Sequence, residues 1–177
     1  MKKIITIIGA TALGKTELAV KIAEKINGEI IGLDSRQIYN YMPIGTAQPT
    51  KGEMRNVKHH LIGTRDPWDS ISAGEYAKMV ITKVNNIKEK GSVPIICGGA
   101  GLYYRAIAKG IFSNSHTDIV LRQELEDKYI ADPVSLMLRL KEIDPEYAKI
   151  VHINNKKRLI RALEIFELTG VSPTENF

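Results

Sequence analysis

The sequence has 177 residues, enough for one domain with a sizeable core and a small appendage, and its 44% hydrophobic and 25% charged residues are ordinary for a soluble globular protein. No apolar run approaches the length of a membrane span, which argues against a helical membrane protein. The net charge of +5 comes without a basic tail, so a polyanionic partner is allowed and is not required.

The N-terminus and the cysteine content predict a cytoplasmic protein. Residues 1–3 run directly into an apolar stretch and are followed by no small-residue cleavage site, so we expect no signal peptide. The single cysteine, Cys97, cannot form an internal disulfide. It follows two isoleucines, which is typical of a free buried thiol in a cytosolic protein.

The first predicted elements are a buried strand over 4–8 and a helix over 15–26. The residues that join them fit the G-x-x-x-x-G-K-[ST] pattern of a phosphate-binding loop, and they are Gly9, Ala10, Thr11, Ala12, Leu13, Gly14, Lys15 and Thr16. Such a loop turns its N–H groups and the helix N-terminus toward an anion. Lys15 adds a point charge, and the Thr16 hydroxyl is placed to bind Mg²⁺. The pattern predicts a phosphate site without naming the phosphate compound.

A second strand is predicted over 29–33, and it ends at Asp34. A carboxylate at this place could help to hold Mg²⁺ or could act as a general base. The stretch over 35–49 is polar and aromatic with Pro and Gly breakers, so it is predicted to be a long loop. Loops of this length in a compact domain are usually functional.

The alternation of strands and helices continues to Lys109. The pattern predicts, in order, a short strand, a helix, a buried strand and a helix, over 59–62, 73–90, 92–97 and 102–109. This order predicts an α/β fold over 1–110, with a parallel sheet flanked by helices as in P-loop NTPases. Ligands of such sheets bind beyond the carboxyl ends of the strands, so the phosphate loop, Asp34 and Gly98-Gly99 are expected to meet at one cleft.

No strand is predicted beyond Gly110. We predict a small all-α insertion over 111–150, in which Asp132-Pro133 and Asp144-Pro145 each begin a helix. A last helix over 155–168 is predicted to return to the core as part of a segment over 151–177, with no further element after it.

Cations cluster in the first turns of that last helix, where the helix dipole disfavours them. They are Lys156, Lys157, Arg158 and Arg161. The cluster favours an external anion such as a nucleic-acid backbone, and a solvated basic face is an equally good interpretation of the cluster by itself.

Taken in order, these motifs resemble those of the tRNA dimethylallyltransferases, also called tRNA isopentenyltransferases. The resemblance covers nearly the whole chain and rests on Asp34-Ser35-Arg36-Gln37-Ile38-Tyr39, Ile44-Gly45-Thr46-Ala47, His59-His60-Leu61-Ile62, Gly98-Gly99-Ala100-Gly101-Leu102-Tyr103, and Arg158-Leu159-Ile160-Arg161-Ala162-Leu163-Glu164 before Thr169-Gly170. Members of this family usually continue well past the Thr-Gly motif, so the chain is expected to lack the usual C-terminal part.

The resemblance implies transfer of a dimethylallyl group from dimethylallyl diphosphate to N6 of the adenosine 3′-adjacent to the tRNA anticodon. It implies that the phosphate loop, Lys15 and a Thr16-bound Mg²⁺ hold the leaving diphosphate, and that Asp34 takes the N6 proton. The tRNA contacts that it implies are Asp34, Ser35, Arg36, Gln37, Ala100, Arg122, Lys157, Arg158, Leu159, Ile160 and Arg161. The expected partners are a tRNA anticodon stem-loop and dimethylallyl diphosphate, and we expect a monomer.

Three residues depart from the family pattern, and three other functions stay open. Ala100 stands where the family usually has Thr, Leu13 stands where it usually has Ser, and Ala10 stands where Pro is common. The alternatives are an ATP-dependent small-molecule kinase, a prenyltransferase that acts on free adenine nucleotides, and an inactive remnant that binds diphosphate or RNA. ATP consumption without tRNA would favour the kinase, and tight diphosphate binding without product would favour the remnant.

Overall fold

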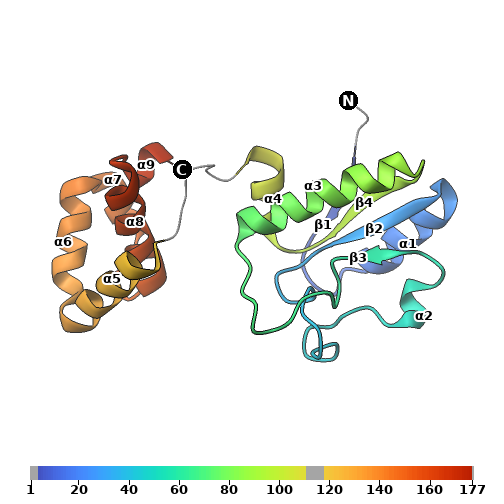
Figure 1. Ribbon diagram of the computed structural model, residues 1–177, viewed down its shortest axis with the longest axis horizontal. Helices are drawn as coiled ribbons and strands as arrows, with labels where there is room; N and C mark the ends of the chain where they lie inside the picture. The colour runs from blue at the N-terminus through green and yellow to red at the C-terminus, as the bar shows by residue number, and fades with distance from the viewer. Residues whose placement is uncertain (1–3, 111–117, 177) are drawn as a thin grey trace. The chain divides into compact units, whose positions relative to one another are not determined.

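The computed structural model describes residues 4–110 and 118–176 and divides the chain into two compact units, residues 1–111 and 112–177. We call the first the sheet unit and the second the helical unit (Figure 1). The sheet unit has the predicted α/β architecture, and the described part of the second unit is all helical, as predicted. The first residues of the predicted insertion, 111–117, lie outside the described residues.

A parallel four-stranded sheet forms the centre of the sheet unit. Its strands are β1 (Ile5–Ile8), β2 (Gly28–Leu33), β3 (His59–His60) and β4 (Val93–Gly98), in the order β1-β4-β2-β3. The long strands β2 and β4 pair along their whole length, from Gly28 opposite Val93 to Leu33 opposite Gly98. Because all the strands run in the same direction, their carboxyl ends lie at one edge of the sheet.

Helices cover both faces of this sheet, and alternate strand residues build two separate cores. The helices of this unit are α1 (Lys15–Ile26), α2 (Lys51–Met54), α3 (Ala73–Glu89) and α4 (Gly101–Lys109). Ile31 and Leu33 pack in one core with residues of α3 and α4, whereas Ile30 packs in the other with residues of α1. This period of two is the pattern expected of a strand that is buried on both faces. Figure 1 shows α3 lying along the sheet.

The short helix α2 was not predicted. A capping box begins it, in which Thr50 accepts from the Glu53 N–H and the Glu53 carboxylate accepts from the Thr50 N–H. The T-x-x-E spacing is a recognised helix-start signal. The signal was therefore present in the sequence, but only one helical turn follows it.

The helical unit contains α5 (Ile119–Ala131), α6 (Pro133–Ile143), α7 (Pro145–Ile150), α8 (Lys156–Thr169) and α9 (Pro173–Asn176). The two Asp-Pro helix starts are confirmed. Asp132 accepts hydrogen bonds from the N–H groups of Val134 and Ser135, and Asp144 accepts one from Tyr147. In both helices Pro occupies the first turn, where its missing N–H would have no partner in the helix.

The last segment contains an element that was not predicted, and its long helix packs within the helical unit. Leu159 and Leu163 of α8 are buried in one core with Leu125 of α5 and Leu140 of α6. The periodicity of α8 predicted a buried face but carried no information about the partner of that face. The short helix α9 also follows the Thr-Gly motif, where no further element was expected.

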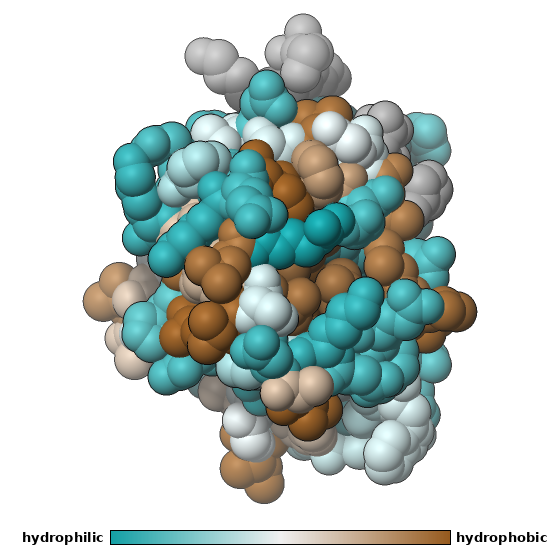
Figure 2. All heavy atoms as spheres, turned by 90° about the vertical axis from the view of Figure 1, so that its left-hand side faces the viewer, coloured by the Kyte–Doolittle hydropathy of each residue, from teal (hydrophilic) through white to brown (hydrophobic). Residues whose placement is uncertain are grey.

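The surface of the helical unit intermixes polar and apolar side chains. Ile119, Ile130 and Leu138 are among its exposed hydrophobic residues. Figure 2 shows hydrophobic residues exposed between hydrophilic ones on the face of the molecule that it draws. None of the helices in residues 4–110 and 118–176 combines the length and the apolar character that crossing a membrane requires.

Asp144 ties α9 to the junction of α6 and α7. Its side chain accepts hydrogen bonds from the Thr174 N–H at 2.6 Å and the Thr174 hydroxyl at 2.8 Å, in addition to the Tyr147 N–H. Burial alone would raise the pKa of this carboxyl. The hydrogen bonds from Tyr147 and Thr174 outweigh burial, so the pKa of Asp144 lies below its usual value.

We expect Asp144→Asn to destabilise the helical unit by about 1–2 kcal/mol at neutral pH. The amide keeps one acceptor oxygen for the Tyr147 N–H and the Thr174 hydroxyl, but it places an NH2 group where Oδ2 accepts from the Thr174 N–H. A carboxyl whose pKa is lower in the folded state stabilises the protein at pH values above its unfolded-state pKa, which is about 3.9 for Asp. This stabilisation is lost as the pH falls through the folded-state pKa. Thermal unfolding should therefore separate the two proteins at pH 7 and bring them together in acid below about pH 4. A difference that persists unchanged in acid would contradict this account.

Candidate active site

Three predicted elements meet at the carboxyl edge of the sheet. Gly98 at the end of β4 is paired with Ile8 of β1 and with Leu33 of β2. The phosphate loop follows β1 and Asp34 follows β2, and β4 lies between these two strands. The start of the loop and Asp34 are therefore about two strand spacings, or about 10 Å, apart. Gly99 lies between them, and its N–H donates to the Leu33 carbonyl at 3.1 Å. No side chain projects from these two glycines into the space between the loop and Asp34.

The loop between β1 and α1 contains two residues with left-handed backbone conformation. Ala12 and Gly14 have positive φ values of 66° and 70°, and α1 begins at the next residue, Lys15. The Lys15 ammonium donates to the carbonyl of Ala10 across the loop. Leu13, which departs from the family pattern, is 69% exposed, so its apolar side chain lies at the surface of the loop.

The cation of Lys15 lies near the end of β4. The pKa of the Cys97 thiol is raised mainly by burial, and the Lys15 cation opposes this shift. Cys97 is half-buried in the structure. A lysine placed between a loop of N–H donors and the end of a central strand can neutralise an anion bound at the start of α1.

Asp34 uses one of its carboxylate oxygens to shape the loop that follows β2. Its Oδ1 accepts from the N–H of Arg36 at 2.8 Å and from the N–H of Gln37 at 3.2 Å. Among the described residues, no hydrogen bond to Oδ2 is found. Asp34 is half-buried, so Oδ2 is the atom that can accept a proton from a bound substrate without disturbing the loop.

Two stacked tyrosines support the end of β2. The rings of Tyr76 and Tyr103 lie 4.3 Å apart, and the Tyr76 hydroxyl donates to the Gly32 carbonyl at 2.6 Å. Burial raises the pKa of both phenols, and the Asp34 carboxylate contributes to each shift. Neither phenol loses its proton at neutral pH, so both remain hydrogen-bond donors beside Asp34.

No pattern in the sequence indicated a role for Tyr76 at the site. Helical spacing does predict that Tyr76 is buried, but the spacing cannot show that its hydroxyl reaches the strand that carries Asp34.

The loop after Asp34 is held by two glutamine side chains. The Gln37 amide donates to the carbonyls of Thr46 and Ala47, and the Gln48 amide donates to the carbonyls of Gln37 and Tyr39. Gln37 was predicted to contact tRNA, and its amide nitrogen is engaged within the loop. Gln48 was not predicted. Both glutamines hold the ends of the loop together, in addition to hydrogen bonds within it such as that from the Thr46 hydroxyl to the Met42 carbonyl.

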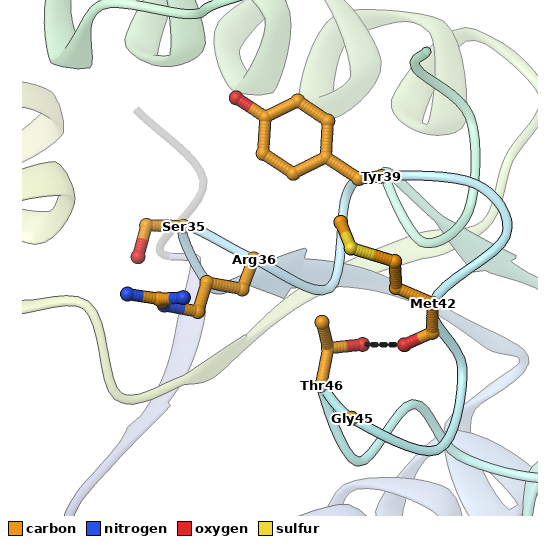
Figure 3. Close-up of a pocket in the computed structure, with 6 residues that line it drawn as sticks. All are labelled: Ser35, Arg36, Tyr39, Met42, Gly45 and Thr46. Carbon is orange, nitrogen blue, oxygen red and sulfur yellow. Dashed lines mark hydrogen bonds between the residues drawn. The ribbon is translucent and has the colours of Figure 1, made fainter. Parts of the chain in front are cut away.

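A cavity of about 500 Å³ opens inside this loop. Figure 3 shows Ser35 and Arg36 on one side of it and Met42 and Thr46 on the other, with the Tyr39 ring beside them. The residues that line it are Ser35, Arg36, Tyr39, Met42, Gly45 and Thr46. The lining combines an apolar thioether, an aromatic ring and a cation, a mixture that suits a planar base with a nearby phosphate.

The Thr16 hydroxyl is exposed at the start of α1, beside a second cavity of about 410 Å³. In residues 4–110 and 118–176, no group of three or more His, Cys, Asp or Glu could hold a metal ion. Mg²⁺ is commonly held by one or two protein oxygens together with substrate phosphates. The Thr16 hydroxyl could supply one oxygen ligand of this kind.

Ala100 lies at the start of α4, close to Asp34. Its N–H donates to the Leu33 carbonyl at 3.1 Å, and it is the N-cap residue of α4 without a side chain that can cap. The departure from Thr at this position therefore removes a hydroxyl next to the carboxyl end of β2.

The other residues predicted to contact tRNA lie in the helical unit. Lys157 and Arg158 are exposed in the first turn of α8, whereas Arg122 and Arg161 both donate to the buried carboxylate of Glu164. Leu159 and Ile160 are 0% and 4% exposed. Their side chains are in the core of this unit, and the prediction that these two residues contact tRNA stays a prediction.

The chain is similar in sequence to known proteins over most of its length. A family model described as IPP transferase matches residues 37–177. The chain belongs to the IPP transferase family. Among curated relatives of this family, a tRNA dimethylallyltransferase of Thermodesulfovibrio yellowstonii is 45% identical over 165 residues, covering 93% of this chain and 52% of the relative. One of Petrotoga mobilis is 42% identical over 175 residues, covering 99% and 57%.

Solved structures of IPP transferases share the fold. A full-length tRNA isopentenylpyrophosphate transferase of Bacillus halodurans has a TM-score of 0.64 at 40% identity, covering 98% of this chain and 57% of that protein. A eukaryotic dimethylallyltransferase acting on tRNA has a TM-score of 0.77 at 29% identity, covering 99% and 44%. The chain thus spans about half the length of the relatives it matches.

Proposed function

We propose that this chain transfers a dimethylallyl group from dimethylallyl diphosphate to N6 of the adenosine 3′-adjacent to a tRNA anticodon. The observation that carries this proposal is the meeting of the phosphate loop and Asp34 at one sheet edge, in a chain that belongs to the IPP transferase family. Relatives named tRNA dimethylallyltransferase match almost the whole chain, which favours prenyl transfer over the kinase alternative.

In the proposed reaction, the loop from Gly9 to Thr16 binds the diphosphate of the donor, and the Lys15 ammonium leaves the Ala10 carbonyl to reach it. Preorganised N–H groups and a cation stabilise the negative charge that develops as the carbon–oxygen bond breaks. Thr16 would hold a Mg²⁺ that enters with the diphosphate, and this ion would add further charge stabilisation to the leaving group.

Asp34 acts on the nucleophile. The exocyclic N6 of adenine forms the new bond to the first carbon of the dimethylallyl group and becomes a stronger acid as it does so. The free Oδ2 of Asp34 accepts the N6 proton, while Oδ1 keeps its hydrogen bonds to the N–H groups of Arg36 and Gln37. The adenine must leave its stack to reach this edge, as in other enzymes that modify bases.

The RNA contacts are proposed to come from both units. Ser35 and Arg36 line the cavity next to Asp34, and the exposed cations of α8 lie in the helical unit, where they can neutralise phosphates. The cytoplasm, where tRNA is modified, is the proposed location, and the active species is proposed to be a monomer.

Incubation with dimethylallyl diphosphate, Mg²⁺ and an anticodon stem-loop tests the proposal. We expect prenylated RNA, and we expect a chelator of Mg²⁺ to suppress its formation. AMP offered as a competitor should remain unmodified if the stem-loop is the substrate. Product on AMP alone, or ATP consumption without RNA, would instead support one of the other enzymes considered above.

A further inference from the structure

Glu164 is a charged residue at the centre of the helical unit. Its side chain is 0% exposed, and its neighbours in α8, Ile160 and Leu163, belong to the apolar core of the same unit. One carboxylate oxygen, Oε2, accepts from the guanidinium of Arg122 in α5 at 2.7 Å and from that of Arg161 in α8 at 2.6 Å. The other oxygen, Oε1, is buried and has no hydrogen-bond partner among the described residues.

The two arginines extend from this buried oxygen to the surface. Their side chains are 39% and 27% exposed, so each arginine is partly open to solvent. Each guanidinium carries five N–H donors in a fixed plane, and the contact with Glu164 leaves most of them available. Two guanidinium groups from different helices are thus held on one atom.

Packing alone does not explain a carboxylate at this position. Removing a carboxylate from water is costly, and apolar residues of similar volume often replace buried ion pairs without loss of stability. Leu or Met at position 164 would match the other buried residues of α8. The property that only the carboxylate provides is a common anchor for Arg122 and Arg161.

We propose that Glu164 is a positioning residue for RNA binding, which holds Arg122 and Arg161 side by side so that they engage neighbouring phosphates of the anticodon arm. This inference rests on the proposed function of the chain. Long cationic side chains lose rotamer freedom when they bind a ligand. Glu164 restricts the two arginines in the free protein, so this part of the entropy loss occurs on folding. The exposed Lys157 and Arg158 extend the same basic surface along α8.

Glu164→Gln separates positioning from net charge. The amide fits the same space but holds the arginines less strongly, and the change adds one positive charge to the unit. If the cations act only through their charge, RNA should bind more tightly. If Glu164 positions them, the affinity for the anticodon stem-loop should fall about tenfold, a reasonable effect for freeing two long side chains.

Two further variants serve as controls. Glu126→Gln makes the same chemical change at an ion pair with Lys156 on the half-exposed part of the unit, and its affinity should stay within about twofold of the wild type. Glu164→Asp keeps the charge but shortens the side chain, so it should also weaken RNA binding. In the Arg161→Gln background, the effect of Glu164→Gln should shrink to less than about twofold, because coupled residues are not additive.

The readouts are the dissociation constant of the stem-loop and the arginine Nε–Hε signals in ¹⁵N NMR spectra of the full chain, which should broaden or merge in Glu164→Gln. Unchanged or tighter RNA binding by folded Glu164→Gln and Glu164→Asp would overturn the inference. A wild-type chain that binds no stem-loop would instead contradict the proposed function. In that case unchanged arginine signals in Glu164→Gln would overturn the positioning role as well, whereas altered signals would support it.

Discussion

Asp34→Asn is expected to lower the rate of prenyl transfer by about 10²–10⁴-fold while leaving diphosphate affinity nearly unchanged, because the amide cannot accept the N6 proton. The structure makes Asn the informative substitution. Its side-chain oxygen can still accept from the N–H groups of Arg36 and Gln37, so the loop after β2 keeps its shape. The measurement is a single-turnover rate with saturating dimethylallyl diphosphate and stem-loop.

Asp34→Ala should be as inactive as Asp34→Asn and should in addition loosen the loop around the cavity. Asp66→Asn is the matched control, because Asp66 accepts from the Trp68 N–H at 3.0 Å in a similar local turn. Its activity should match that of the wild type. Equal turnover by Asp34→Asn and the wild type would exclude Asp34 as the general base, whether or not the chain is a prenyltransferase.

Gly98→Ala is expected to destabilise the sheet unit by at least about 3 kcal/mol, a large share of the stability of a typical domain. A Cβ at this position would lie 2.1 Å from the Leu33 carbonyl oxygen and 2.8 Å from the Leu33 Cα. Both atoms belong to the backbone of a central strand, so no side-chain rotation relieves the contact. Strands β2 and β4 would have to separate at their carboxyl ends, next to Asp34.

Gly101→Ala provides the control for this prediction. Its Cβ would meet nothing within 4 Å, and the residue begins α4, where Ala is preferred to Gly. Chemical denaturation should therefore show a wild-type or slightly raised stability for Gly101→Ala and a strong loss for Gly98→Ala. Similar stabilities for the two variants would mean that the close approach of β4 to Leu33 is not a constraint.

Local signals predicted most of the fold. The strand, loop and helix around Lys15 were predicted because apolar runs, glycines and helical spacing act within a few residues of one another. The Asp-Pro pairs predicted the starts of α6 and α7 for the same reason, since a cap and a first-turn proline are local features. The meeting of the phosphate loop with Asp34 followed from the general geometry of parallel sheets.

Local signals could not predict which elements of the chain pack against each other. The periodicity of α8 predicted a buried face, and only the structure shows that α5 and α6 cover it. Position 164 lies four residues after Ile160, on that buried face, so the spacing alone could have indicated a buried glutamate. No local pattern indicates that Arg122, 42 residues away, shares its carboxylate.

Mass spectrometry of the RNA product tests whether this chain prenylates an adenosine of tRNA. The stem-loop would be incubated with the chain, dimethylallyl diphosphate and Mg²⁺, and then digested to nucleosides. We expect a dimethylallyl group on N6 of the adenosine that follows the anticodon, and a stem-loop without that adenosine should stay unmodified. Unmodified RNA, recovered from a folded chain that binds both the stem-loop and the diphosphate, would contradict this expectation.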